Sequence, residues 1–203
     1  MVLNYPHEWM ADMKALILDG SNEDDRTSEA VHRSVVDVLL GLKWEVQTLI
    51  LREMKIAPCM GCFGCWVQTP GRCVIDDMGR DIARSFIRSD LAIFLSPVTF
   101  GGYSSELKKG LDRSIGLIMP FFTKIGGEIH HKPRYKKYPS LMGIGVLSKK
   151  DEESERIFKT LLQRNALNFH APAYAVGTFF RDSGEDDIRS SIGSLFVSIG
   201  LKP

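Results

Sequence analysis

The 203-residue sequence has no long apolar run, no excess of charge of one sign, and only four cysteines. Because its apolar runs fall well short of the roughly 20 residues that span a bilayer, we expect no transmembrane helix. The balance of 26 basic against 25 acidic residues predicts no general attraction to nucleic acid or to a membrane surface. The first dozen residues are too polar for a signal peptide. We therefore expect a soluble, cytoplasmic protein.

All four cysteines lie in one segment, residues 58–77, as Cys59, Cys62, Cys65 and Cys73. Two successive C-x-x-C steps place three thiols within one short turn, and the turn at residues 69–71 can bring the fourth back towards them. A [4Fe-4S] cluster requires four converging thiolates. Structural zinc also takes four ligands, usually from two separated C-x-x-C pairs. Free or redox-active thiols that line a pocket are a third interpretation, and the cysteine pattern leaves all three open.

The rest of the chain alternates between apolar strand patterns and helical patterns. Helices are expected from about Thr27 to Gly41, after a cap at Asp76 and Asp77, from near Ser105, over 151–168, and at the end of the chain. The expected strands are 14–18, 44–50, 91–95, 141–147 and 174–180. Five such strands predict an α/β flavodoxin-like three-layer sandwich, with a five-stranded parallel sheet in the order 2-1-3-4-5 and helices on both faces.

Two segments fall outside this alternation. Residues 1–12 are interpreted as an N-terminal arm before a single domain that covers residues 13–203. Residues 117–138 form an excursion with a Phe121-Phe122 pair and a basic run at 130–137. A connection of that length in a compact domain usually serves function or an interface, so we expect one of these roles for it.

Two loops should meet at the carboxyl ends of the first and third strands, where ligands bind in a sheet of this order. The first loop, residues 20–28, offers hydroxyl groups and backbone N–H groups at a helix N-terminus, which suits a phosphate. The second loop, residues 97–104, carries Gly101-Gly102 between two aromatic residues. Because glycine allows close approach to the backbone, a flat heteroaromatic ring can lie against this loop.

With these loops and the cysteine run, the chain resembles the NADPH-dependent FMN reductase group of flavodoxin-like proteins, and within it the iron–sulfur flavoproteins. The resemblance rests on the Gly20-Ser21 loop, on Pro97-Val-Thr-Phe-Gly-Gly-Tyr-Ser104 followed by Leu107-Lys108, and on the cysteine spacing. It covers nearly the whole chain from Lys14 onwards. The family's C-x2-C-x2-C-x4–7-C pattern is matched with the longest form of its last gap.

The resemblance implies an FMN site formed by both loops. The phosphate would be bound by the first loop, where Glu23 stands at a position that is often arginine in such proteins, so either Arg26 replaces that arginine or the loop rearranges. The flavin ring would be held by the backbone of the second loop. The candidate FMN-binding residues are Ser21, Asn22, Arg26, Thr27, Ser28, Pro97, Val98, Thr99, Phe100, Gly101, Gly102, Tyr103 and Ser104.

The expected function is that of an FMN oxidoreductase with NAD(P)H as electron donor and a cysteine-ligated [4Fe-4S] cluster near the flavin. No side chain need act as an acid or a base, because the flavin carries the chemistry. The acceptor would be a small redox partner or a small molecule, and the resemblance implies a homodimer or homotetramer. A reductase of FMN, quinones or nitro compounds without a cluster is one alternative. A non-catalytic zinc-binding or thiol redox-sensing protein is another.

Overall fold

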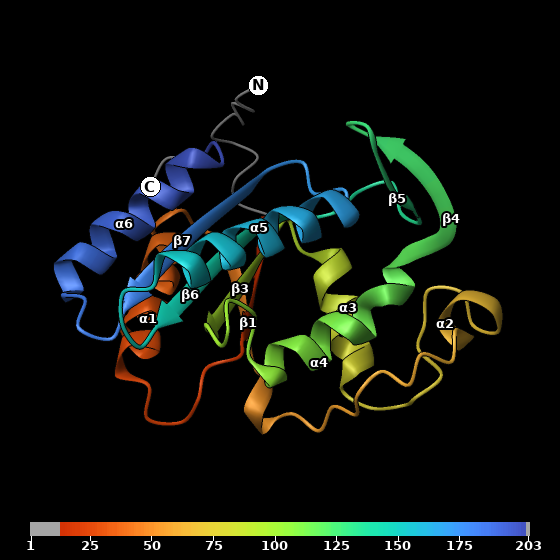
Figure 1. The fold of residues 1–203 in the computed structure, drawn as a ribbon, viewed down its shortest axis with the longest axis horizontal. Helices are drawn as coiled ribbons and strands as arrows, with labels where there is room; N and C mark the ends of the chain where they lie inside the picture. Colours follow the sequence, from red (N-terminus) through yellow and green to blue (C-terminus); the bar gives the residue numbers. More distant parts are fainter. Residues whose placement is uncertain (1–12, 202–203) are drawn as a thin grey trace.

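The computed structural model describes residues 13–201 and contains the expected parallel sheet (Figure 1). Its five strands lie in the order β2-β1-β3-β6-β7, which is 2-1-3-4-5 when only the strands of this sheet are counted. The strands are β1 (Lys14–Asp19), β2 (Glu45–Ile50), β3 (Leu91–Pro97), β6 (Ser140–Leu147) and β7 (Tyr174–Phe180). The fold prediction is therefore confirmed, while the proposed arm at residues 1–12 lies outside the described residues.

Two layers of helices cover the sheet (Figure 1). On one face, α1 (Arg26–Gly41) and α6 (Glu185–Ser198) pack together on a core that includes Val31, Leu39, Ile93 and Phe196. On the other face lie α3 (Gly79–Arg88), α4 (Ser105–Arg113) and α5 (Glu152–Asn168). The central strands are buried on both faces, which is why 91–95 and 141–147 are continuous apolar runs. No helix in residues 13–201 is both long and apolar enough to cross a bilayer.

The excursion at residues 117–138 is a β-hairpin that lies beside the main sheet. A short 3₁₀ turn, η3 (Ser114–Leu117), leads into β4 (Ile118–Ile125), which pairs antiparallel with β5 (Glu128–Pro133). Its base is closed by hydrogen bonds: Arg134 Nε donates to the Gly116 carbonyl at 2.8 Å and the Tyr138 hydroxyl to the Leu117 carbonyl at 2.6 Å. The sequence pattern did not predict these strands, because β4 alternates weakly and exposes Phe121 and Phe122.

Two further short helices frame the cysteine segment. One is η2 (Leu51–Glu53), directly after β2, and the other is α2 (Gly64–Val67), which carries Cys65. The cap prediction at Asp76 and Asp77 was only partly right. Helix α3 begins at Gly79 after Met78, whose side chain makes no cap hydrogen bond, although Asp77 Oδ1 accepts a hydrogen bond from the Gly79 N–H at 2.9 Å. Most of the Asp77 carboxylate is turned towards Arg113 instead.

Candidate functional site

The two predicted FMN loops lie side by side, joined through Ser104. The Ser104 hydroxyl donates to the Gly20 carbonyl at 2.7 Å and accepts from the Leu107 N–H at 3.3 Å, so it also caps α4. The Ser104 N–H donates to the Ser96 hydroxyl at 2.8 Å. A Cβ on Gly20 would lie 2.7 Å from Ser104 Oγ, so only glycine allows this approach. The two loops therefore meet beyond the carboxyl ends of β1 and β3, as expected.

Ser104→Ala should lower the free energy of unfolding by about 1–2 kcal/mol, because it removes a helix cap and a buried hydrogen bond. It should also weaken FMN binding, since the loops would no longer be tied together. Chemical denaturation and FMN titration measure both effects. Ser105→Ala, at the exposed neighbouring position, is the control and should stay within about 0.5 kcal/mol of wild type. Equal stability of the two variants would contradict this role of Ser104.

In the first loop, the hydroxyl groups of the candidate residues already have partners. Thr27 Oγ1 donates to the Arg181 carbonyl at 2.9 Å, and Ser28 Oγ donates to Asp25, which is the cap of α1. The Asn22 and Arg26 side chains are exposed. Ser21 is buried, with its N–H bonded to Asp19 at 2.9 Å. The loop therefore presents Asn22 and Arg26 most directly, while Ser21, Thr27 and Ser28 are buried.

Arg52 is a residue of this region that the sequence interpretation missed. It belongs to η2, and its Nη1 lies 3.4 Å from Ser21 Oγ and 3.5 Å from the Ser21 carbonyl oxygen. A guanidinium beside the first loop is suited to a phosphate. The sequence does contain a signal for Arg52 as a site residue. It follows directly after the second strand, and the carboxyl ends of parallel strands lie together at one edge of the sheet.

The second loop forms a tight turn with an exposed tip. Thr99 and Gly102 exchange backbone hydrogen bonds of 3.0 and 2.9 Å, and Phe100 at the tip is 98% exposed. Gly101 has φ +75° and a Cβ there would lie 2.7 Å from Ile157 of α5, so glycine is required. Before the turn, Val98 N–H donates to the Val146 carbonyl at 2.8 Å. The turn therefore exposes the Phe100 ring at its tip, while Gly101 is buried against Ile157 of α5.

Tyr103 ends this turn and points into the protein. Its hydroxyl accepts a hydrogen bond from Asn165 Nδ2 at 3.0 Å, and its ring packs edge-on against Phe94 and Phe158. Burial raises the pKa of the Tyr103 hydroxyl well above its usual value, although the bond from Asn165 acts the other way. Tyr103 therefore stays protonated at neutral pH and acts as a packing residue between the loop and α5.

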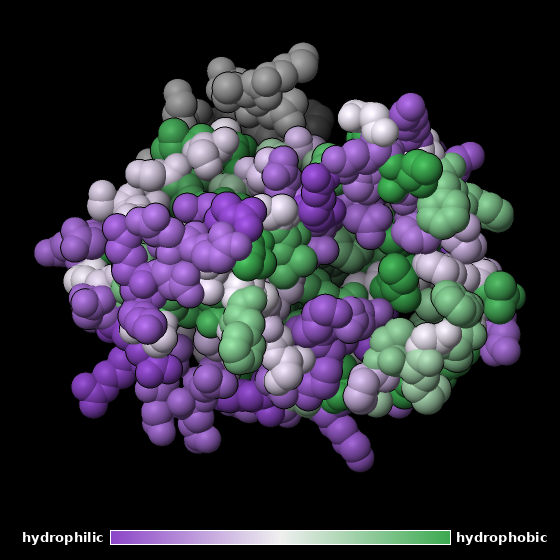
Figure 2. Space-filling model, in the orientation of Figure 1, coloured by the Kyte–Doolittle hydropathy of each residue, from purple (hydrophilic) through white to green (hydrophobic). Residues whose placement is uncertain are grey.

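The four cysteines line one pocket of about 470 Å³ between the cysteine segment, α4 and α5. Figure 2 shows the hollow between the region of α5 and the apolar surface formed near α2 and the hairpin. Cys59 and Cys62 are exposed, Cys73 is half-buried and Cys65 is buried; all four are free thiols. Tyr103 lines the same pocket. The cysteine cavity therefore reaches the end of the second predicted FMN loop, through this one residue of 97–104.

The thiols are near one another but do not converge. Burial raises the pKa of the Cys65 thiol, and so does the charge of Cys73, Cys59 and Cys62 when these are ionised. Even so, within residues 13–201 no three histidine, cysteine, aspartate or glutamate side chains come close enough to hold a metal ion. Four thiols on one cavity wall have the ligand type and number that a [4Fe-4S] cluster needs. In this structure they are spread more widely than cluster ligands would be.

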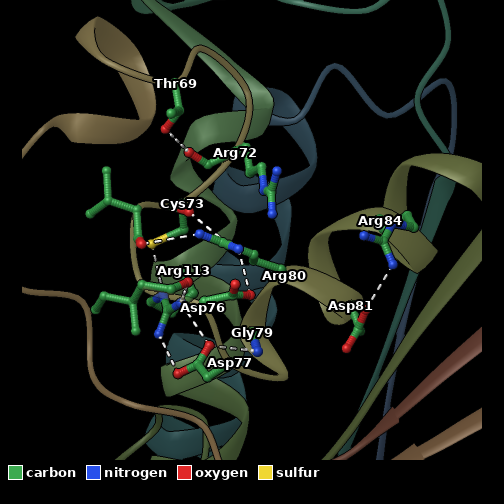
Figure 3. Close-up of polar contacts among 12 residues, drawn as sticks. Thr69, Arg72, Cys73, Asp76, Asp77, Gly79, Arg80, Asp81, Arg84 and Arg113 are labelled. Carbon is green, nitrogen blue, oxygen red and sulfur yellow. Dashed lines mark hydrogen bonds and ion pairs between the residues drawn. The ribbon is translucent and has the colours of Figure 1, made fainter.

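Arg113 anchors both ends of the cysteine segment. This role could not be predicted, because Arg113 resembles an ordinary helix-surface residue in the sequence. Its side chain is fully buried. It donates to the Ala57 carbonyl at 2.8 Å, to the Ile75 carbonyl at 3.2 Å and to both Asp77 oxygens at 2.7 and 2.9 Å. Its Nε donates to Cys73 Sγ at 3.2 Å (Figure 3). One cation therefore holds the two flanks and one thiol of the segment.

Trp66 connects the middle of the cysteine segment to the base of the hairpin. Its indole N–H donates to the Ile115 and Ile118 carbonyls at 3.2 and 2.9 Å. The ring stacks on Phe63, with centroids 5.4 Å apart, and lies against His131 of β5 at 5.2 Å. Trp66 therefore has a structural role directly beside Cys65.

The chain is similar in sequence to two iron–sulfur flavoproteins. The chain is 30% identical over 119 residues to an iron–sulfur flavoprotein of Methanocaldococcus jannaschii, covering 58% of this chain and 61% of that protein. A second iron–sulfur flavoprotein, from Methanosarcina thermophila, is 30% identical over 103 residues, covering 51% of this chain and 53% of its own length. The chain therefore aligns with less than two thirds of either relative.

Among solved structures, the fold is similar to that of an FMN-dependent NADH-azoreductase from Bacillus anthracis in complex with FMN, with a TM-score of 0.64, 13% identity and coverage of 88% of this chain and 93% of that one. It is also similar to an NAD(P)H:quinone oxidoreductase from Methanothermobacter marburgensis, with a TM-score of 0.63, 15% identity and coverage of 90% and 92%. At these identities the likeness concerns the fold. The family model for NADPH-dependent FMN reductases matches residues 13–133, and the chain belongs to this family.

Proposed function

We propose that this flavin-dependent reductase carries a [4Fe-4S] cluster on Cys59, Cys62, Cys65 and Cys73 and passes electrons from NAD(P)H through FMN and the cluster to an acceptor. The observation that supports this most is the shared cavity: it is lined by every cysteine of the chain and by Tyr103 of the second FMN loop. Both cofactors would then lie close together. The resemblance to two iron–sulfur flavoproteins supports the same assignment.

The chain's own residues would bind and orient the cofactors. Ser21, Asn22 and Arg26 would bind the phosphate, and Arg52 would add a second guanidinium beside Ser21. The backbone of 97–104 would support the flavin ring. When bound, flavin exchanges two electrons as hydride and an iron–sulfur cluster exchanges single electrons, so together they connect a hydride donor with a one-electron acceptor.

Cluster binding requires movement of the exposed cysteines. Cys73 is fixed by Arg113, and Cys65 is buried on α2 with its Sγ 3.5 Å from the Cβ position of Gly116. Cys59 and Cys62 lie on the exposed part of the segment, where Gly61 and Phe63 have φ of +64° and +56°. We propose that this part of the segment closes over the cluster while α2 and Cys73 keep their places.

We also propose that the protein forms a homodimer or homotetramer through the surface next to this site. The hairpin exposes Phe121, Phe122 and Ile129, and the cysteine segment exposes Met60, Phe63 and Val67. Figure 2 shows apolar side chains gathered over this side of the molecule. Contiguous apolar surface of this kind is typical of protein interfaces.

Absorption spectra of anaerobically purified protein, before and after addition of NADPH, test the proposal. We expect flavin peaks together with a broad iron–sulfur shoulder, both bleached by NADPH, and iron and sulfide in the protein. Flavin peaks alone, bleached by NADPH, would instead indicate the second candidate, a reductase without a cluster. That candidate is favoured by the open arrangement of the thiols and by the hydrogen bond from Arg113 to Cys73. A spectrum without flavin would contradict both.

A further inference from the structure

A second pocket, of about 320 Å³, borders Cys73 and has walls rich in arginine. Three of the arginines, at positions 80, 84 and 88 of α3, are spaced four residues apart and so lie on one face of that helix. The other two are Arg72 of the cysteine segment and Arg113 of α4. No acidic residue of the described chain lines this pocket. Figure 3 shows Arg72 and Arg80 near Cys73, and Arg84 farther along α3 beside Asp81.

Three of these arginines already have carboxylate partners outside the pocket wall. Arg113 pairs with Asp77 at 2.7 Å, and Arg84 with Asp81 at 2.8 Å. Arg80 Nη1 lies 2.5 Å from Asp76 Oδ1, an ion pair without hydrogen-bond geometry, while its other nitrogens donate to the Cys73 and Val74 carbonyls. These pairs neutralise three of the five positive charges.

Arg72 and Arg88 supply the excess charge. Both are exposed, and within residues 13–201 neither side chain has a carboxylate partner. They come from different elements, the cysteine segment and the last turn of α3, and both line the same cavity. Two guanidinium groups that lack partners and face one cavity are suited to an anion with more than one oxygen, because each can donate two parallel hydrogen bonds.

The remaining wall is apolar and aromatic. Ala83, Ile87 and Leu117 contribute aliphatic surface, and Tyr135 follows the hairpin with its hydroxyl 2.9 Å from the Cβ position of Gly71. Tyr135 is 37% exposed, so its ring is accessible. A volume of about 320 Å³ lies at the lower end of the range for small-molecule sites, which is about 300–1,000 Å³.

We propose that this pocket binds a small phosphorylated molecule with a planar ring, that is, a ligand of the nucleotide class. Arg72 and Arg88 bind its phosphate groups, and Tyr135 with the aliphatic wall contacts its ring. The occupant would lie beside Cys73 and Arg113, outside the two FMN loops. This inference does not depend on whether the cysteines hold a cluster.

Isothermal titration of the FMN-loaded protein with adenosine 2′,5′-bisphosphate and with pyrophosphate tests the proposal. We expect the nucleotide to bind more tightly than pyrophosphate. Arg72→Gln and Arg88→Gln should each weaken both ligands about tenfold, because each removes charge-assisted hydrogen bonds. Tyr135→Ala should weaken the nucleotide only. Arg156→Gln, at an exposed arginine of α5, is the matched control and should change neither affinity.

Three results would overturn the proposal. One is that neither adenosine 2′,5′-bisphosphate nor pyrophosphate binds at millimolar concentration. Another is nucleotide binding that Arg72→Gln and Arg88→Gln leave unchanged, since a nucleotide held only at the FMN loops would be insensitive to both. The third is equal affinity for the two probes with no effect of Tyr135→Ala, which would indicate a site for simple anions. Both arginines are exposed, so the variants should fold normally.

Discussion

Arg113→Met is expected to lower the free energy of unfolding by about 3 kcal/mol, which corresponds to a decrease in Tm of about 6–12 °C for a chain of this size. The substitution removes a fully buried cation and leaves the Asp77 carboxylate, which is 13% exposed, without its partner. It also leaves the Ala57 and Ile75 carbonyls without their side-chain donor. Thermal and chemical denaturation of the protein without added metal measure the loss.

Matched variants separate the ion pair from general damage. Arg156→Met removes an exposed arginine that pairs with Glu153, and should change stability by no more than about 0.5 kcal/mol. Adding Asp77→Asn to Arg113→Met should cost less than the sum of the two single changes, because both break the same pair. If Arg113→Met were as stable as Arg156→Met, the anchoring role of Arg113 would be wrong.

The same variant should show a characteristic pH dependence. Burial alone would raise the pKa of Asp77, but hydrogen bonds from Arg113 and from the backbone N–H groups of Ala57 and Gly79 outweigh it, and the folded pKa lies below the ordinary 3.8. A carboxyl group of this kind stabilises the fold fully above the unfolded pKa, and loses this contribution as the pH falls through the folded pKa. The difference between wild type and Arg113→Met should therefore shrink below about pH 4.

Cys65→Ala is expected to abolish the proposed cluster while leaving FMN in place. Cys65 is the buried cysteine of the four, at the start of α2, and no other thiol of the chain can replace it. The anaerobically purified variant should contain almost no iron or sulfide, and its spectrum should keep the flavin peaks. Met60→Ala, on the same segment with a 70% exposed side chain, is the control and should retain iron at the wild-type level.

Two outcomes would argue against this assignment. Wild-type iron content in Cys65→Ala would show that the metal is bound elsewhere. Zinc in place of iron in the wild-type protein, lost in Cys65→Ala, would keep the cysteines as ligands but exclude the electron-transfer role, since zinc has no redox chemistry in proteins. Tight FMN binding in either case would still support a flavin-dependent reductase.

Much of the fold could be predicted because strands that are buried on both faces are continuous apolar runs in the sequence. The strand at 91–97 is apolar on both faces, and the strand at 174–180 was expected at the residues where it lies. The hairpin could not be predicted in this way. Its exposed Phe121, Phe122 and Ile129 obscure the alternation by which a half-buried strand is normally detected.

For the site, the sequence predicted that the two loops meet and that the cysteines lie near one another, but not which residues hold them in place. Loop positions follow from strand order, so the contact between the Gly20 and Ser104 regions could be anticipated. The burial of Arg113 depends on carbonyl groups from residues 57 and 75, which are distant in the chain. The engagement of Thr27 with Arg181 likewise joins the first loop to a turn after β7, and no local pattern encodes it.

The closed base of the hairpin has a consequence for how such proteins diversify. The chain enters at Gly116 and Leu117 and leaves at Arg134 and Tyr138, and hydrogen bonds join these two points. Sequence can therefore be added or removed beyond the base without altering the path from α4 to β6. Because the Trp66 ring also lies against His131 of β5, with centroids 5.2 Å apart, changes near His131 would alter a contact of the cysteine segment. Substitutions in the hairpin can in this way alter the surroundings of the four cysteines without disturbing the sheet.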